Sequence, residues 1–162
     1  MNSSKLEELF NSYHRQIYQF TYRYTQDETL SAEITQDTFI KFHNYKESFD
    51  PAKSHIRTFL FRIAYQLTMT KLKRRNKFKK LLPFLYERHN VSSISLDDKI
   101  SIRTALMELP QSHRSVIILF YYHALSHNEI SDILQIPIGT VKSRLYHSLK
   151  KLKHLLEVED DE

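Results

Sequence analysis

Residues 125–145 carry side chains whose spacing suits contact with duplex DNA. Ser126 and Glu129 stand three residues apart, which is the spacing of a capping box that begins a helix by satisfying its free backbone amides. Pro137 cannot continue that helix but suits the start of the next one. Two short helices joined by a tight turn form a helix-turn-helix, whose second helix can enter the major groove.

The predicted second helix, which begins at Ile138, buries an apolar stripe and leaves a polar face outward. The outward residues are Gly139, Thr140, Lys142, Ser143, Arg144 and His147. Lys142 and Ser143 can reach base edges, whereas Thr140 and Arg144 can hold phosphates. A helical hairpin with a solvated basic face is the alternative. Gly139 allows either close approach to DNA or close packing of the two helices, and the sequence leaves both open.

A helix predicted over residues 55–75 carries aromatic side chains interleaved with bases. Phe61 and Tyr65 lie outside its core stripe by the helical period, and Arg57 and Arg62 lie near that side. Unpaired bases stack on aromatic rings while cations follow the phosphates, so this face suits single-stranded DNA. The alternative is that both rings pack on the linker or on the other domain.

The sequence offers no chemistry for an enzyme. A single glycine cannot build a dinucleotide or phosphate loop, and the lack of cysteine excludes thiolate metal sites and thiol nucleophiles. His123 and His127 are four residues apart, but they straddle a predicted helix break and lack a third ligand. We therefore expect a non-enzymatic protein with no metal and no cofactor.

Apolar residues recur at intervals of three and four, and glycine and proline are scarce, so we expect an all-α protein. Three helices over residues 6–25, 29–45 and 55–75 predict an N-terminal domain within residues 1–76. Residues 77–98 break the period and predict a flexible linker, with room for a short helix at 81–88. Four helices over residues 97–109, 112–124, 126–134 and 138–156 predict a C-terminal domain within residues 99–156.

The net charge of +5 is unevenly distributed. Residues 71–80 hold seven Lys or Arg and no acid, and residues 142–154 hold five and no acid. Residues 157–162 contain five acids, and we expect them to form an acidic tail. The basic blocks suggest a polyanionic partner or a plain solvated face. No segment approaches a membrane span and residues 1–8 are polar, so we expect a cytoplasmic protein without membrane insertion.

Several segments resemble bacterial sigma factors, the promoter-recognition subunits of RNA polymerase. AEITQDTFIKF at residues 32–42, IRTFLFRIA at 56–64 and LKRR at 72–75 are similar to their second conserved region. ALMELP at residues 105–110, the helix at 126–134 and GTVKSR at 139–144 resemble their fourth conserved region. The order and the short linker are similar to the extracytoplasmic-function group, which keeps only these two regions.

The resemblance implies a function, partners and site residues. The chain would bind core RNA polymerase and direct initiation at specific promoters, and an anti-sigma factor would hold it inactive. The second helix would grip the clamp helices of the largest polymerase subunit through Glu33, Gln36, Asp37 and Ile40. The third helix, with the loop at residues 46–54, would hold the melted minus-ten strand through Arg57, Phe61, Arg62, Tyr65, Lys73, Arg74 and Arg75. The helix-turn-helix would bind the duplex minus-thirty-five element.

A different class of protein is the rival. A dimeric helix-turn-helix regulator that acts without docking on polymerase explains the recognition helix. It leaves the segment from Glu33 to Phe42 and the aromatic face of the third helix unexplained. Binding measured with and without core polymerase discriminates between the two, because only a sigma factor needs the enzyme.

Overall fold

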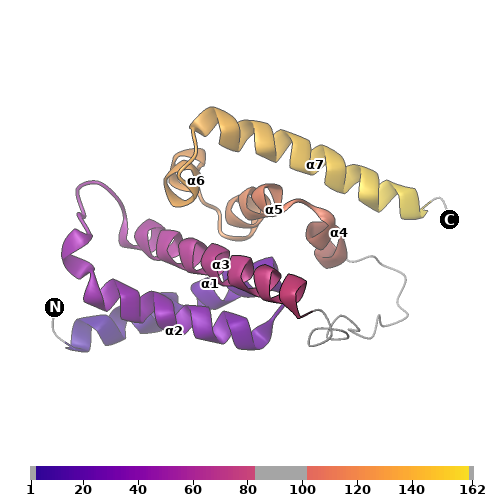
Figure 1. Cartoon of the computed structure of the whole chain (residues 1–162). Coiled ribbons are helices and arrows are strands. Elements are labelled where there is room, and N and C mark those ends of the chain that lie inside the picture. Colours follow the sequence, from indigo (N-terminus) through magenta and orange to yellow (C-terminus); the bar gives the residue numbers. More distant parts are fainter. Residues whose placement is uncertain (1–2, 83–101, 161–162) are drawn as a thin grey trace.

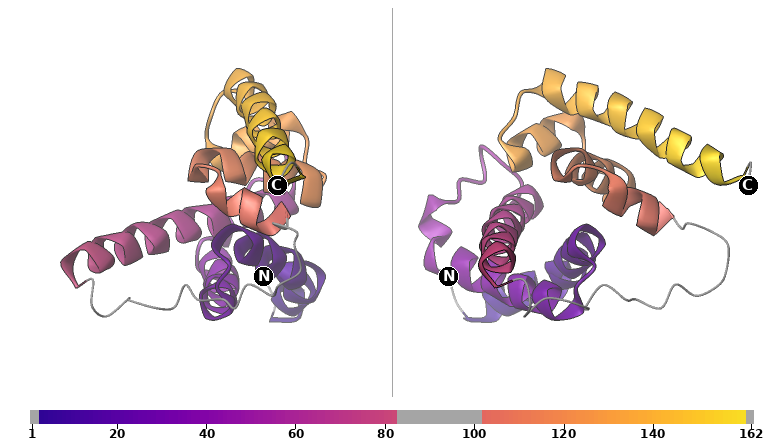
Figure 2. Two further views of the ribbon diagram at one scale, coloured as in Figure 1. Left: turned by 90° about the vertical axis from the view of Figure 1, so that its right-hand side faces the viewer. Right: turned by 45° about the vertical axis from the view of Figure 1, so that its right-hand side comes forward.

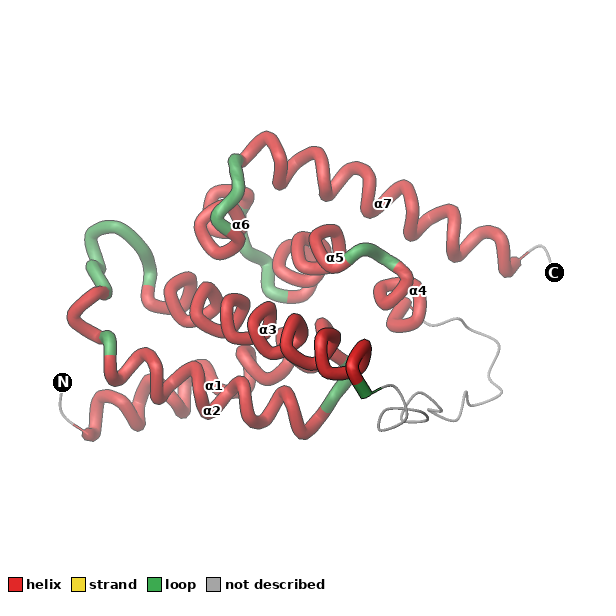
Figure 3. Tube along the Cα trace, viewed as in Figure 1, coloured by secondary structure: helices red, strands yellow, loops and turns green. Residues whose placement is uncertain are grey.

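The computed structural model describes residues 3–82 and 102–160, and within these ranges it contains helices and connecting loops but no strand (Figure 3). Helices α1 (Ser3–Thr25), α2 (Glu28–Asn44) and α3 (Ile56–Leu81) form the N-terminal domain. Helices α4 (Ile102–Glu108), α5 (Gln111–Ile117), α6 (His127–Leu134) and α7 (Ile138–Asp160) form the C-terminal domain. The predicted all-α fold of two helical domains is confirmed.

The three N-terminal helices enclose a core of residues spaced by three and four. Ile17, Phe20 and Tyr24 of α1 are fully buried, as are Ile34 of α2 and Leu60 of α3. Asp27 begins α2 by accepting a hydrogen bond from the Leu30 amide at 2.9 Å. A short 3-10 helix, η1 (Lys46–Ser48), and a loop lead from α2 to α3.

Buried threonines in this core need no partner outside their own helix. The hydroxyls of Thr21, Thr38 and Thr68 each donate to the carbonyl four residues earlier, at 2.7 to 3.0 Å. Because a buried hydroxyl is costly only when unpaired, these bonds let threonine fill positions between helices.

Helix α3 runs six residues past its predicted end at Arg75 and stops at Leu81. No glycine or proline precedes Pro83 to end it. Three ion pairs, two from Lys71 and one from Arg75, join the second half of α3 to α2 and its cap residue Asp27. Residues 77–81 are therefore helical although they were predicted to be linker. The rest of the predicted linker, and the short helix predicted at 81–88 beyond Leu81, lie outside the described residues.

The C-terminal domain departs from prediction at two helix ends. The helix predicted over residues 112–124 is α5 followed by a π-helix, η3 (Ile118–Tyr122), which Ala124 closes with a positive φ of 51°. Helix α7 continues to Asp160, so residues 157–160 of the predicted acidic tail are helical. Lys153 and Glu157 form an ion pair one turn apart at 3.8 Å within this extension.

The two domains pack directly against each other, with α7 on the far side of the C-terminal domain (Figures 1 and 2). Contacts join α3 to α6 and α1 to η3, and we call this surface the seam. The Tyr24 hydroxyl of α1 donates to the Gln111 carbonyl at 3.1 Å. Arg114 of α5 returns a hydrogen bond to the Tyr24 carbonyl at 3.0 Å.

Buried Arg114 links the seam to the interior of the C-terminal domain. Besides the Tyr24 carbonyl, its guanidinium donates to the carbonyls of Leu106, Met107 and Leu109 at 3.0 to 3.1 Å. Three of these four acceptors lie at the end of α4, where helix carbonyls lack partners within the helix. Burial lowers the pKa of Arg114 from its ordinary value, and nearby Tyr24 opposes that shift.

Candidate nucleic-acid interface

Helices α6 and α7 form the predicted helix-turn-helix, and the capping box that begins α6 is present. The Ser126 hydroxyl accepts a hydrogen bond from the Glu129 amide at 3.1 Å, and the Glu129 carboxylate accepts one from the Ser126 amide at 3.2 Å. Gln135 makes the turn in the left-handed conformation, with φ 58° and ψ 46°. Glycine or asparagine usually occupies a left-handed position that ends a helix, and here glutamine adopts it.

The first turns of α7 present the predicted recognition residues to solvent. Lys142, Ser143 and His147 are exposed, while Thr140 and Arg144 are half-buried. Val141 and Leu145 are buried on the opposite side, as the helical period predicted. The predicted face is therefore open to a partner along its length.

Gly139 lies at the start of this face and is exposed. A Cβ built on Gly139 meets no atom within 4 Å. Close packing of the two helices therefore does not require glycine here, and that alternative is wrong. Close approach to DNA remains the prediction for this position.

Part of the basic block at residues 142–154 acts on His113 of α5, which the sequence did not indicate. Burial lowers the pKa of His113 from its ordinary value, and the positive groups of Arg144, His147 and Lys151 lower it further. Residues 144, 147 and 151 are also spaced by three and four, which places them on one side of α7. A concentration of positive charge of this kind suits a phosphate backbone. His113 comes from another helix, which is why spacing within α7 could not find it.

Phe61 is not the exposed ring that the sequence predicted. It is fully buried at the seam, where its ring meets Phe20 with centroids 5.5 Å apart and His123 with centroids 5.0 Å apart. The alternative, in which this ring packs on the other domain, is the one the structure shows. Its contact with Phe20 of α1 also makes Phe61 part of the core of its own domain, so the prediction that it lies outside that core is wrong.

Arg57 and Tyr65 also face the C-terminal domain. Arg57 donates to the His123 carbonyl at 2.6 Å and to the Gln16 side chain at 2.8 Å. Tyr65 is half-buried, and burial raises the pKa of its hydroxyl while the nearby charge of Arg144 opposes the shift. The charge of Arg144, predicted to contact one DNA element, thus acts on Tyr65, predicted to contact the other.

The remaining residues predicted to contact the minus-ten strand spread along the outer part of α3. Lys73 and Arg74 are exposed and Arg62 is half-buried. Arg75 forms an ion pair with Asp27 at 3.0 Å, so it fastens α3 to the start of α2. The structure therefore does not bring the seven predicted residues together on one open surface.

The predicted polymerase-binding residues do share one face of α2. Glu33, Gln36 and Ile40 are exposed and Asp37 is half-buried. Lys71 of α3 bridges the two carboxylates, at 2.5 Å from Glu33 and 3.1 Å from Asp37. Partial burial lowers the pKa of Lys71, but its hydrogen bonds to both carboxylates outweigh burial and raise it. The sequence did not indicate this bridge.

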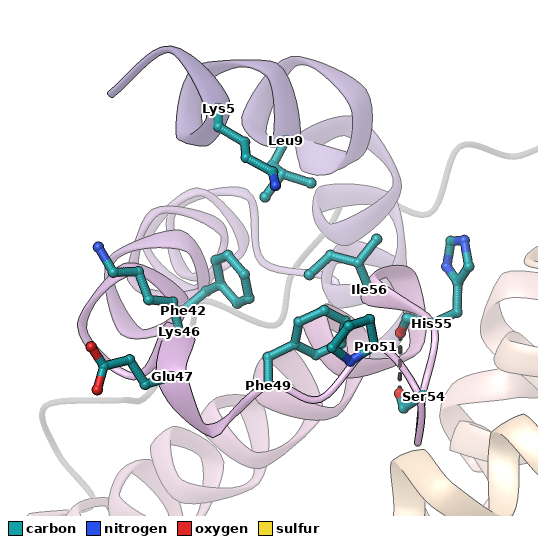
Figure 4. A pocket seen from close by; sticks show the side chains of 10 residues that line it. All are labelled: Lys5, Leu9, Phe42, Lys46, Glu47, Phe49, Pro51, Ser54, His55 and Ile56. Atoms are coloured by element: carbon teal, nitrogen blue, oxygen red, sulfur yellow. Dashed lines mark hydrogen bonds between the residues drawn. The ribbon is translucent and has the colours of Figure 1, made fainter. Parts of the chain in front are cut away.

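A pocket of about 690 Å³ opens between the start of α1 and the loop that precedes α3 (Figure 4). Phe42, Phe49 and Ile56 form an apolar wall, and Lys5 and Lys46 lie at its edge. Phe49 packs on Phe59 with ring centroids 5.1 Å apart, which fixes the loop against α3. Most of the pocket belongs to the loop at residues 46–54 and its neighbours.

The described ranges also bear on two other features, a metal site and a membrane span. No group of three or more His, Cys, Asp or Glu side chains in residues 3–82 and 102–160 is placed to hold a metal ion. Nor does any helix of these ranges combine the length and apolar character that a membrane span requires.

The fold and the interface define a class: a two-domain helical protein that carries a helix-turn-helix. Comparison with known proteins narrows this class. The family described as Sigma-70 region 2 matches residues 9–78, and the one described as Sigma-70, region 4 matches residues 99–152. The chain belongs to the sigma-70 family, in its extracytoplasmic-function group.

Individual relatives agree with this assignment. The chain is 28% identical over 170 residues to the ECF RNA polymerase sigma factor SigW of Bacillus subtilis, covering 92% of this chain and 87% of that protein. Its fold matches the sigma factor RpoE of Bartonella quintana, solved with the anti-sigma factor NepR, with a TM-score of 0.78, 21% identity and coverage of 95% and 98%. It also matches CnrH, solved with the cytosolic domain of CnrY, with a TM-score of 0.74, 22% identity and coverage of 97% and 90%.

The family assignment gives the function in outline. The protein is an alternative sigma factor, which directs promoter recognition with RNA polymerase. The match over residues 9–78 includes the segment from Glu33 to Phe42, which a dimeric regulator left unexplained. Sigma factors are regulatory initiation factors rather than known enzymes.

Proposed function

We propose that the two domains divide promoter recognition between them. Helix α7 reads the duplex minus-thirty-five element, α2 docks on the clamp helices of the largest polymerase subunit, and α3 with its preceding loop holds the melted minus-ten strand. The observation that carries the proposal is the open polar face at the start of α7, where Lys142, Ser143 and His147 are exposed beyond the helix-turn-helix. Residues 1–76 and 99–156 would serve as the two working units.

The bridge by Lys71 supports the role of α2 in docking. Two carboxylates held by one ammonium at 2.5 and 3.1 Å are fixed in position before a partner arrives. A basic partner meets an acidic surface that is already ordered, which reduces the entropy lost on binding. Exposed Ile40 adds apolar area beside the charges, as protein interfaces require.

The pocket at the loop supports a role in holding an unpaired base (Figure 4). A base has two apolar faces and a polar edge, and the pocket offers the half-buried ring of Phe49 beside the amines of Lys5 and Lys46. Stacking on rings stabilises an unpaired base by about 1–3 kcal/mol, and the amines attract the phosphate on either side. The predicted base-reading loop thus has a cavity of suitable chemistry.

The proposed role also implies a regulatory partner and a cellular location for the chain. Both structural relatives were solved with an inhibitory partner or with a partner's cytosolic domain. We infer that an anti-sigma factor likewise binds this chain. We also infer that the chain works in the cytoplasm with polymerase and performs no catalysis itself, since polymerase joins the nucleotides.

Run-off transcription with purified core polymerase tests the proposed function. The template is a library of promoter fragments from the source genome, and the start sites are mapped. The chain should direct initiation at a limited set of sites that share two sequence elements, while core alone does not. A chain that gives no specific start sites, and binds duplex DNA as a dimer without core, contradicts the proposal.

A further inference from the structure

His123 is the one titratable side chain of the seam that lacks a hydrogen bond at a buried atom, among the residues that the structure describes. Its imidazole Nε2 is fully enclosed and has no partner, and only 5% of the residue is exposed. Phe61 of α3 and Phe20 of α1 meet the imidazole edge to face, with ring centroids 5.0 and 6.1 Å away. If this nitrogen bound a proton, the new N–H group would lie between two phenyl rings and would have no hydrogen-bond acceptor nearby.

The charged groups around His123 are positive on both facing helices. Arg57 of α3 donates to the His123 carbonyl at 2.6 Å, and Arg23 of α1 lies over the Tyr122 ring at 4.3 Å. Neither arginine forms an ion pair with a carboxylate of the described residues. On its own domain, His127 of α6 stacks on Phe120, and Arg114 of α5 is bound to carbonyls. Nothing in the surroundings therefore compensates a positive charge on the imidazole.

We propose that His123 makes the seam an acid-sensitive latch, which holds the two domains together when the imidazole is neutral and releases them when it is protonated. Release exposes Arg57, Phe61 and Tyr65, which the closed arrangement covers. The link from release to capture of the minus-ten strand rests on the proposed function, but release itself does not. Separation of the domains lets the imidazolium reach water, which removes the penalty of a buried charge.

The direction of the pH effect follows from the two states. Burial, and then the charges of Arg23 and Arg57, lower the pKa of His123 in the closed chain from 6.5 to about 4. In the open chain the exposed imidazole has its ordinary pKa, so the open state binds the proton more readily. Stability of the closed state is therefore complete above the ordinary pKa and falls as the pH drops toward the closed value. Between roughly pH 7.5 and pH 5.5, the ratio of closed to open chain should fall about tenfold.

The test uses the full chain, which contains no cysteine and so accepts two site-specific dyes. Ala32→Cys on α2 and Lys150→Cys on α7 place them at exposed positions of different domains. Energy transfer between the dyes reports the inter-domain distance, and far-ultraviolet circular dichroism of the same samples reports helix content. We expect the distance to increase on acidification while helix content stays constant. An unchanged distance, or a change that accompanies loss of helix, overturns the proposal.

Variants assign the effect to His123. His123→Phe keeps a ring of similar shape but cannot be protonated, so its distance should stay constant over the same pH range. His43→Gln, which removes an exposed imidazole on α2, should keep the pH profile of the unaltered chain. Acid release that persists in His123→Phe overturns the proposal. If His123→Phe is already open at neutral pH, nuclear magnetic resonance titration of the unaltered chain decides: a His123 pKa at its ordinary value contradicts the latch, and a value well below it supports the latch.

Discussion

Of the two surfaces predicted to contact DNA, one is exposed to solvent and the other is covered by the second domain. The face at the start of α7 is open, with Lys142, Ser143 and His147 exposed. The face of α3 that carries Arg57, Phe61 and Tyr65 lies against the other domain. The difference follows from chemistry. A basic polar face is stable in water, whereas covering an aromatic face lowers the free energy of the molecule. A surface suited to stacking on bases is therefore prone to cover itself when no DNA is present.

The largest expected effect tests whether Phe61 is covered in solution. Phe61→Ala should lower the free energy of unfolding by about 3–5 kcal/mol, because it leaves a cavity between Phe20 and His123. Urea denaturation of the full chain measures the loss. The matched control is Tyr146→Ala, since that ring is 63% exposed and its removal should cost less than about 0.5 kcal/mol. Equal effects of the two substitutions would show that Phe61 is free and would remove the contrast between the two surfaces.

The next effect concerns the third surface, the acidic face of α2. Asp37→Arg should weaken binding to core polymerase about 30-fold, roughly 2 kcal/mol, because it reverses a charge at the predicted docking site and repels Lys71. A competition assay against a labelled sigma factor measures the affinity. Glu8→Arg makes the same charge change at an exposed position of α1 and should leave the affinity unchanged. Comparable losses in both variants would point to net charge rather than to this face.

A smaller effect tests the open surface. Lys142→Ala should lower affinity for a duplex minus-thirty-five element about tenfold and reduce the dependence of binding on salt, since one cationic contact is lost. Fluorescence anisotropy with the complete holoenzyme at several salt concentrations measures both. Lys153→Ala removes an equal charge from the far part of α7, and we expect little change. If Lys153→Ala weakens binding as much, the basic face acts without a defined recognition site.

The smallest effects compare Gln135, in the turn between α6 and α7, with Gly139 at the start of α7, and so separate backbone strain from DNA contact. Gln135→Gly should raise stability by about 0.5–1 kcal/mol, because glycine adopts the left-handed conformation without strain. Gly139→Ala should raise stability by a similar amount, because the added Cβ meets nothing within 4 Å and alanine favours helix. Thermal unfolding measures both. Only Gly139→Ala should weaken duplex binding, by a few-fold; a variant that binds normally would show that DNA does not approach this backbone.

Local features of the fold were well predicted from the sequence. The capping box of Ser126 and Glu129 and the burial of Val141 and Leu145 depend on residues that are close in the chain. Ile138 and Leu149, which the same period places on the buried stripe, are 39% and 42% exposed. The end of α3 at Leu81 was not predicted, because the apolar period breaks after Arg75; the helix nevertheless continues, since no glycine or proline precedes Pro83. The π-helix at η3 was missed as well, since its hydrophobic pattern resembles that of an α-helix.

The site was predicted less completely, for a related reason. Helical spacing placed Phe61 outside the core of its own domain, which is wrong, because the ring packs on Phe20 of α1. Spacing within one helix also does not reveal that His123 of the second domain covers the ring. The surroundings of His113 and the bridge formed by Lys71 were missed because both involve residues of two different helices. Contacts between helices are the information that a periodic pattern lacks.

The hydrogen bonds of Arg114 affect what the molecule loses when its two domains separate. Three of its four carbonyl partners belong to its own domain, and the one across the seam is Tyr24. If the domains separate, the guanidinium keeps the end of α4 in order and exchanges one bond for water. Each of the two domains can then retain its own shape after they separate.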